Sequence, residues 1–209
     1  MNEPNPAHEL PKAPTPRLNR QLKFLLEADK LKTVERQTHL ADASRRENSA
    51  EHSWHFALAL LLFAEYAREE NLDSLKILQM AVLHDLVEID AGDTFVYDQN
   101  AQNSRRAREE NAANRLFGLL PDDQNQKFRA IWEEFEAKQT PEARFASAID
   151  RFSPVLQNFV TQGKAWRKHG VSVEQVEKVV GTELENAPEL ANFLRLLVET
   201  AGEKGFLKR

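Results

Sequence analysis

The spacing of apolar residues predicts a series of helices from residue 17 to the C-terminus. Leucines recur close to every 3.6 residues from Leu18 to Leu31, which marks one face of a first helix ending near Lys32. The same reasoning predicts further helices over residues 50–70, 75–88, 102–117, 122–138, from 141 onward, 172–186 and 188–209. No alternation of apolar and polar residues is sustained, so the sequence predicts an all-α fold.

Two prolines mark the helix that begins near residue 141. Pro141 follows Thr140, and a threonine cap with proline in the first turn is a strong helix start. Pro154 lies inside the same pattern and predicts a kink or a split there. Residues 90–101 form the longest interior stretch without a helical pattern. Because long loops often carry function, this segment is a candidate functional loop.

Composition limits the domain organisation. Five of the nine prolines fall within residues 1–16, which predicts a flexible, disordered N-terminal arm followed by one globular domain over residues 17–209. The arm lacks the apolar core of a secretory signal peptide, and the longest apolar run is nine residues, from Phe56 to Ala64. We therefore expect a cytoplasmic protein without a membrane span. The absence of cysteine excludes disulfides, thiolate metal sites and a cysteine nucleophile.

The charge balance argues against a nucleic-acid partner. Lysine and arginine together number 28 against 33 acidic residues, a net charge of −5. No basic run stands out along the chain, whereas a duplex-binding surface needs clustered positive charge to neutralise phosphates. We therefore expect no binding to duplex nucleic acid. The charged stretch 105–110 is interpreted as a solvated helix face.

A cluster of imidazole and carboxylate side chains stands where a helix is expected to end. His84 and Asp85 are followed by Glu88 and then by Asp93. On a helix, the side chains at positions 84, 85 and 88 converge on one side. The apolar residues 80–83 would carry this cluster into the interior, where unpaired charge is costly. A bound cation would compensate that charge.

Two more polar residues occupy positions where apolar ones are expected. His52 lies on the predicted apolar helix over residues 50–70, and Asp150 lies near the end of an apolar stretch. With His84 and Asp85 they form a mixed set of nitrogen and oxygen donors. Such a set suits one divalent transition-metal ion, namely Mn, Co, Fe, Ni or Zn. A single buried histidine taken alone is more often a hydrogen-bonded core residue.

The order and spacing of these residues resemble a known family. His52, then His84 with Asp85, then Asp150 follow the H…HD…D order of the HD-domain metal-dependent phosphohydrolases. A finer resemblance to the branch with the bacterial 5′-deoxynucleotidases and their eukaryotic HD-domain relatives is carried by residues 31–36, 47–53, 84–93 and 150–158. The resemblance spans about residues 20–160, and it implies a helical HD-type domain.

The resemblance implies a role for each matching residue. It identifies the metal ligands as His52, His84, Asp85 and Asp150. It also implies that Glu88 and Asp93 position or activate the attacking water and that Arg36 binds phosphate. The chemistry suits these roles, because a divalent cation lowers the pKa of water, a carboxylate accepts a proton and a guanidinium holds two phosphate oxygens. His55 matches no ligand of the family, so we leave it out of the site.

Each of the other assignments has a purely structural alternative. Glu88 could be a surface residue at a helix end, although a negative charge there opposes the helix dipole. Asp93 could be a turn residue and Arg36 a solvated charge. An ion pair between Asp150 and Arg151 is disfavoured, because adjacent helix residues do not face each other.

The resemblance implies hydrolysis of a phosphate ester, and the expected substrate is a nucleoside 5′-monophosphate in its ribo or deoxy form. Gln37 stands where the better-known deoxynucleotidases have an aromatic residue, so the selectivity for sugar and base stays open. The alternatives are a nucleotide phosphodiesterase, a triphosphohydrolase and a non-catalytic nucleotide-binding module. The filled ligand positions favour catalysis, and the lack of a glycine-rich loop favours a monophosphate. The resemblance also implies a homodimer.

Overall fold

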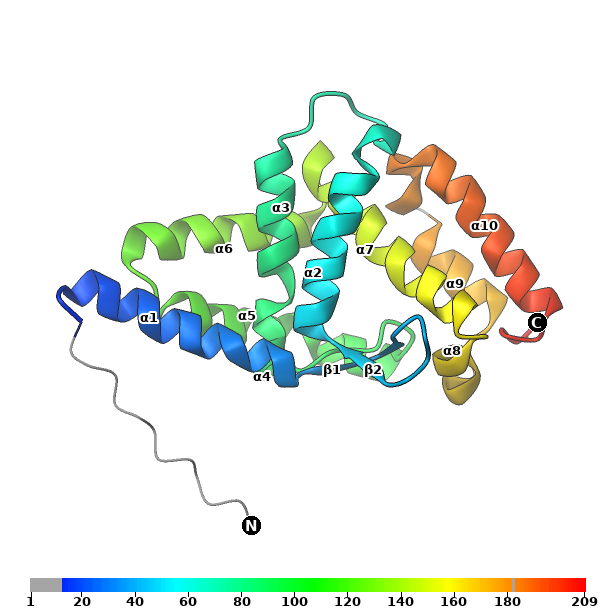
Figure 1. Cartoon of the computed structure of the whole chain (residues 1–209), viewed down its shortest axis with the longest axis horizontal. Coiled ribbons are helices and arrows are strands. Elements are labelled where there is room, and N and C mark those ends of the chain that lie inside the picture. Colours follow the sequence, from blue (N-terminus) through cyan, green and yellow to red (C-terminus); the bar gives the residue numbers. More distant parts are fainter. Residues whose placement is uncertain (1–12, 182) are drawn as a thin grey trace, which may run out of the picture.

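The structure is a computed structural model that describes residues 13–181 and 183–209. It is largely helical, which confirms the predicted all-α fold (Figure 1). The α-helices are α1 (Pro16–Ala28), α2 (Ser49–Leu62), α3 (Ser74–Leu83), α4 (Glu88–Ala91), α5 (Gln99–Phe117), α6 (Asp122–Ala137), α7 (Pro141–Val160), α8 (Lys164–His169), α9 (Val173–Val180) and α10 (Pro188–Glu203). The 3₁₀ turns are η1 (Asp29–Thr33), η2 (Ala64–Tyr66), η3 (His84–Val87) and η4 (Glu183–Asn186), and the strands are β1 (Glu35–His39) and β2 (Arg46–Asn48). Residues 1–12, which make up most of the predicted arm, lie outside the described residues.

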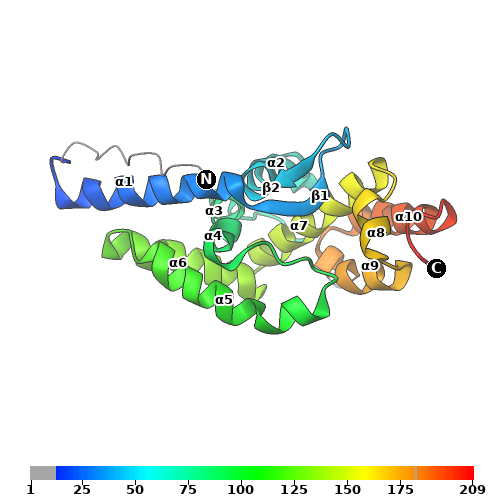
Figure 2. The same ribbon diagram turned by 90° about the horizontal axis from the view of Figure 1, so that it is seen from below.

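Helix α7 lies at the centre of the helical packing. It contacts α2, α3, α6 and α10. Figure 1 shows α2 and α3 side by side, with α5 and α6 extending to one side and α8, α9 and α10 at the other end. Figure 2 shows α1 running along the same side as α5 and α6, where Arg17 of α1 forms an ion pair with Asp123 of α6. Among the residues that the structure describes, no helix combines the length and apolar character needed to cross a bilayer.

Local capping starts helix α2 close to the predicted ligands. The side chain of Asn48 accepts the backbone N–H of Glu51 at 2.9 Å, and the Glu51 carboxylate accepts the backbone N–H of Asn48 at 3.1 Å. This reciprocal capping box begins α2 at Ser49 and sets His52 in its first turn. Since β1 pairs antiparallel with β2, Arg36 on β1 lies near the same helix start.

The helix predicted over residues 75–88 is interrupted. Helix α3 ends at Leu83, and the 3₁₀ turn η3 separates it from the short helix α4. The imidazole Nδ1 of His84 contacts the carbonyl oxygen of Ala81 at 3.0 Å. In a continuous α-helix that carbonyl would accept the backbone N–H of residue 85, so the side chain competes with the helix at this point.

Other boundaries also differ from the prediction. The helix predicted over residues 50–70 ends at Leu62, and the one predicted over residues 172–186 ends at Val180. Helix α7 is not split, because it continues through Pro154 as far as Val160. A proline inside a helix removes one backbone hydrogen bond, and the packing of α7 against four helices holds both of its halves in place.

Three elements have no counterpart in the sequence prediction. The strands β1 and β2 consist entirely of polar residues, so they show no apolar alternation. Helix α8 has only six residues and is flanked by Gly163 and Gly170, which adopt φ angles of 68° and 65°. A helix of this length shows no clear 3.6-residue period.

Aromatic side chains form the apolar floor beneath the predicted ligands. Phe56 and Phe135 are buried, and their ring centroids lie 5.0 and 5.1 Å from that of the His84 imidazole. The ring of Phe56 also stacks on His52 at 5.9 Å. Packed rings exclude water from this side, so the polar groups above them must find partners within the site.

Candidate metal centre

The four predicted ligands come from three elements and meet in one buried cluster. His52 lies on α2, His84 and Asp85 lie on η3, and Asp150 lies on α7. Ligand atoms of His52, His84 and Asp85 all lie within 4.8 Å of one another. Asp150 Oδ1 lies 2.9 Å from His52 Nε2 and 3.8 Å from His84 Nε2. The fold therefore brings the whole predicted set together.

The orientation of His84 leaves one ring nitrogen facing the cluster. Its Nδ1 contacts the carbonyl oxygen of Ala81, which requires the proton on that nitrogen. Its Nε2 is buried and makes no hydrogen bond to any described residue, although Asp85 Oδ1 lies 3.1 Å away. The Nε2 lone pair is therefore available to a ligand at the centre of the cluster.

Burial sets the protonation states of these groups. It lowers the pKa of His52 to about 3 and also lowers the pKa of His84, so both imidazoles are neutral near pH 7. Burial raises the pKa of Asp85 to about 8, against the opposing charge of Arg36. Burial would also raise the pKa of Asp150, but a hydrogen bond with His52 and the charge of the Arg151 guanidinium hold this pKa well below the usual range.

Arg36 reaches the cluster from strand β1. Its Nη1 donates to Asp85 Oδ2 at 3.0 Å, and its Nε lies 3.4 Å from Glu47 Oε2. Burial alone would lower the pKa of Arg36, but the nearby carboxylates, led by Asp85 and Asp93, raise it above its ordinary value. The guanidinium is therefore a fixed positive charge beside the predicted ligands. Arg36 is not a solvated charge, which was the alternative interpretation of the sequence.

Glu88 and Asp93 lie next to the cluster and line the same cleft. Glu88 is buried and accepts a hydrogen bond of 2.6 Å from the Ser49 hydroxyl. Asp93 follows Gly92, whose φ of 73° turns the chain out of α4. Burial raises the pKa of both carboxyls, and the charge of Asp85 adds to the shift at Glu88.

The surroundings of Glu88 and Asp150 differ from those predicted from the sequence. Glu88 is the first residue of α4 and not the end of a longer helix, so the helix dipole does not disfavour its charge. Arg151 Nη1 lies 3.8 Å from Asp150 Oδ2, although adjacent helix residues were expected not to meet. The arginine side chain is long enough to bring its guanidinium back toward the neighbouring carboxylate.

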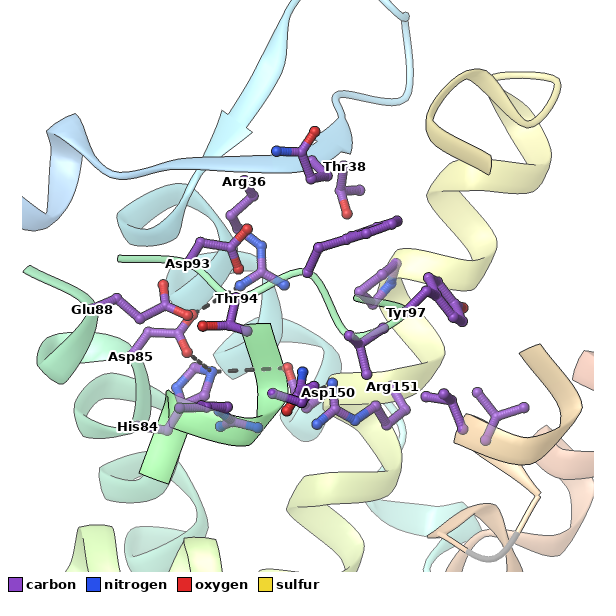
Figure 3. A pocket seen from close by; sticks show the side chains of 18 of the residues that line it. Arg36, Thr38, His84, Asp85, Glu88, Asp93, Thr94, Tyr97, Asp150 and Arg151 are labelled. Carbon is purple, nitrogen blue, oxygen red and sulfur yellow. Dashed lines mark hydrogen bonds and ion pairs between the residues drawn. The ribbon is translucent and has the colours of Figure 1, made fainter. Parts of the chain in front are cut away.

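Figure 3 shows the cleft above the cluster. The labelled side chains come from β1, from the segment after α3 and from α7, and they gather around one opening. The labelled lining residues are Arg36, Thr38, His84, Asp85, Glu88, Asp93, Thr94, Tyr97, Asp150 and Arg151. Residues 93–97 belong to the segment between Asp90 and Ala101, and they line one side of the cleft.

Other residues of the cleft and its surroundings were not predicted from the sequence. Arg105 lines the cleft and binds Glu109 at 2.6 Å and Glu136 at 3.4 Å, while Glu109 is buried. The interpretation of stretch 105–110 as a solvated face was therefore wrong for Arg105 and Glu109. Ser49 and Glu47 are also buried around the site. Their position close to His52 in the sequence is the signal that could have identified them as residues of the site.

The donor set fits a divalent cation. Two neutral imidazoles and two carboxylates supply nitrogen and oxygen donors, and His84 Nε2 is a buried donor atom without a hydrogen bond to any described residue. A cation would also compensate the negative charge of a cluster in which burial disfavours ionised carboxyls. The cluster is therefore a candidate metal-binding site.

Comparisons with known proteins agree with the fold. The chain is 28% identical over 137 residues to the 5′-deoxynucleotidase HDDC2 of Bos taurus, an alignment that covers 65% of each chain. It is 47% identical to a solved structure described as a predicted metal-dependent phosphohydrolase from Magnetospirillum magnetotacticum MS-1, with a TM-score of 0.86 over 92% of this chain and 99% of that one. The PH0347 protein from Pyrococcus horikoshii OT3 shares the fold at 21% identity, with a TM-score of 0.61 over 84% of this chain and 99% of that one.

The matching part of the chain includes every residue predicted for the site. The family described as HD domain matches residues 28–191, which runs from the end of α1 into α10. This range holds α2, β1, η3 and α7, the elements that carry the four predicted ligands and Arg36. The chain belongs to the HD domain family.

Proposed function

We propose that this protein is a metal-dependent phosphohydrolase that releases phosphate from nucleoside 5′-monophosphates. One observation carries the proposal: the buried cluster of four predicted ligands opens, through His84, Asp85 and Asp150, into the same cleft as two further acids and a buried guanidinium. That combination supplies a metal site, proton acceptors and a phosphate partner within one opening.

The cleft residues divide the chemistry between them. When bound, a divalent cation supplies positive charge that acidifies water and polarises a phosphate oxygen. Glu88 and Asp93 orient the attacking water and accept its proton. Arg36 holds the phosphate oxygens and balances the charge that develops as the ester bond breaks. The apolar floor under His84 keeps bulk water away from one side of these groups.

The charges of the cleft favour a monophosphate over a triphosphate. Arg105 and Arg151 also line the cleft, but each of the three arginines there, Arg36 included, lies beside at least one carboxylate. The cleft therefore offers no surplus of positive charge for additional phosphate groups. A monophosphate concentrates its charge on one group, which one metal and Arg36 can largely balance. The bovine relative is named a 5′-deoxynucleotidase, which supports the same substrate class.

The proposal is tested with purified protein that is stripped of metal and reloaded with Mn, Co, Mg or Zn in turn. Phosphate release is measured from ribo- and deoxynucleoside 5′-monophosphates and the matching triphosphates. We expect metal-dependent release, with kcat/KM for monophosphates at least about tenfold higher, roughly 1.4 kcal/mol in transition-state stabilisation. Equal or faster turnover of triphosphates would instead favour a triphosphohydrolase, and binding without turnover a regulatory module.

The metal is proposed to be Mn, Co, Fe, Ni or Zn, because these ions accept mixed nitrogen and oxygen donors. A cytoplasmic location stays a prediction of the sequence.

We also propose that two copies associate through an exposed apolar face on α2, because the exposed side chains of Trp54, Leu58, Leu61 and Leu62 lie on one side of the helix. Sedimentation of Leu61→Glu as a monomer, beside a dimeric parent protein, would support this interface. A monomeric parent protein would contradict it.

A further inference from the structure

Glu47 is a buried carboxylate to which the mechanism assigns no role. It is the middle residue of β2, and its side chain is 2% exposed. Its Oε1 accepts a hydrogen bond of 2.9 Å from Nε2 of Gln157 on α7. Its Oε2 is also buried but has no hydrogen-bond partner among the described residues. Burying an unsatisfied carboxylate oxygen is costly, so its position calls for a physical reason.

The unsatisfied oxygen faces two functional side chains at once. Glu47 Oε2 lies 3.4 Å from Arg36 Nε and 3.7 Å from His52 Nδ1. Arg36 Nε is likewise buried without a hydrogen bond to any described residue. His52 directs its other nitrogen, Nε2, toward Asp150 Oδ1 at 2.9 Å. Glu47 Oε2 therefore lies between Arg36, the proposed phosphate-binding arginine, and Nδ1 of His52, the ring nitrogen that does not face Asp150.

The geometry matches a general feature of metal sites. An imidazole that binds a metal through Nε2 carries its proton on Nδ1, and that N–H usually donates to a carboxylate or a carbonyl that fixes the ring. For His84 this acceptor is the Ala81 carbonyl. For His52, Glu47 is the one carboxylate within 4.0 Å of Nδ1 in the described part of the chain. At 3.7 Å this contact is too long for a hydrogen bond in the present structure, where His52 Nε2 faces Asp150 Oδ1 at 2.9 Å. Glu47 is nevertheless the carboxylate beside the Nδ1–H that His52 would carry with a metal on Nε2.

We propose that Glu47 is a positioning residue that orients His52 toward the metal and Arg36 toward the phosphate group of the substrate. The inference rests on the proposed function, since it takes His52 as a ligand and Arg36 as the phosphate partner. Gln157 anchors Oε1, which leaves Oε2 to serve both neighbours. A single buried carboxylate then couples the alignment of the metal site to that of the phosphate site.

The test replaces Glu47 with glutamine, which keeps the shape and removes the charge. Mn²⁺ is titrated by calorimetry into metal-free protein, and inorganic phosphate is then titrated into the metal-loaded protein. For Glu47→Gln we expect the Kd for Mn²⁺ to rise about 10–100-fold, the usual effect of losing such a partner. The Kd for phosphate should rise at least about fivefold, because Arg36 loses its alignment.

Glu51→Gln is the matched control. Glu51 lies four residues further on, its side chain is 35% exposed, and glutamine also serves in a capping box. Both dissociation constants should stay within about twofold of the parent values, because an exposed ion pair contributes little. An equal loss in both variants would overturn the proposal, as would unchanged affinities in Glu47→Gln.

A test in a second variant, Arg36→Lys, distinguishes a positioning role of Glu47 from a general loss of structure in Glu47→Gln. In an Arg36→Lys protein, Glu47→Gln should no longer change the phosphate affinity but should still weaken Mn²⁺ binding, because the two effects pass through different side chains. An undiminished effect of Glu47→Gln on phosphate in that background would contradict the assignment. If Glu47→Gln does not fold, Gln157→Met serves instead, since it frees Oε1 and keeps the carboxylate. It should weaken Mn²⁺ binding more than twofold, and an unchanged Kd would overturn the proposal.

These measurements follow binding and need no turnover. A protein that binds Mn²⁺ and phosphate but hydrolyses no nucleotide would contradict the proposed function and leave the result for Glu47 standing. A fully active nucleotidase whose affinities are unchanged by Glu47→Gln would contradict the inference alone.

Discussion

Replacing Asp150 with asparagine should remove metal binding and leave the fold intact. Asp150 Oδ1 lies 2.9 Å from His52 Nε2 and 3.8 Å from His84 Nε2, so it belongs to the centre of the cluster. The asparagine oxygen can still accept the N–H of His52, and the metal-free protein should therefore stay folded. The variant loses the negative charge of a predicted ligand, and we expect the metal Kd to rise at least about 100-fold, the upper end of the effect of losing an outer partner.

The size of the effect on melting follows from mass action. Metal at 100 times the Kd stabilises the parent protein by about 2.7 kcal/mol. For a chain of this length, 1 kcal/mol corresponds to about 2–4 °C, so the melting temperature should rise by about 5–11 °C. At the same concentration the Asp150→Asn protein is at most half saturated. It gains no more than about 0.4 kcal/mol, which is about 1–2 °C.

The assay is thermal unfolding with and without Mn²⁺, together with calorimetric titration of the metal. Asp90→Asn is the control, because Asp90 is an exposed acid on α4 that binds Arg115 outside the cleft. This control should keep the full metal-induced rise in melting temperature. A Kd for Asp150→Asn within about threefold of the parent value would refute the reasoning, and so would an equal loss in Asp90→Asn.

Three further predictions concern individual groups of the cleft. Glu88→Gln should keep the metal and lower kcat by about 10²-fold or more, because the substitution removes a proton acceptor. Steady-state kinetics and metal analysis of the same sample measure both effects. An unchanged kcat would exclude this role for Glu88. Arg36→Ala should erase most of the preference for monophosphates over triphosphates while the metal stays bound, which a comparison of kcat/KM values tests; a preserved preference would exclude Arg36 as its source. Metal affinity should rise about tenfold per pH unit from pH 6 to 8 and then level off, because below a pKa of about 8 the Asp85 carboxyl holds a proton that the metal must displace. Calorimetry across that pH range measures the slope, and an affinity that does not change with pH would contradict the shifted pKa.

The helical class and the residues of the cluster could be predicted from the sequence, because apolar spacing and an ordered set of polar residues are properties of the chain alone. The hairpin formed by β1 and β2 could not be predicted from the sequence. Its inward residues, Arg36 and Glu47, are polar because they face the site and not an apolar core. The pattern that normally reveals a strand is therefore missing where the strands carry function.

The break in the helix at His84 was also beyond the sequence. It depends on a side chain that takes the Ala81 carbonyl from the helix, and nothing in the local residue pattern shows which acceptor an imidazole chooses. Glu47 belonged to a block that carried the family resemblance, but its role depends on contacts with Gln157, 110 positions away in the sequence. Such contacts exist only in the folded chain.

The most direct test of the central claim is a crystal structure of the protein grown with Mn²⁺ and measured at the manganese absorption edge. We predict one strong anomalous peak within about 2.0–2.3 Å of Nε2 of both His52 and His84 and of a carboxylate oxygen from both Asp85 and Asp150. A peak coordinated by other residues, or no peak in this cluster at saturating Mn²⁺, would contradict the account.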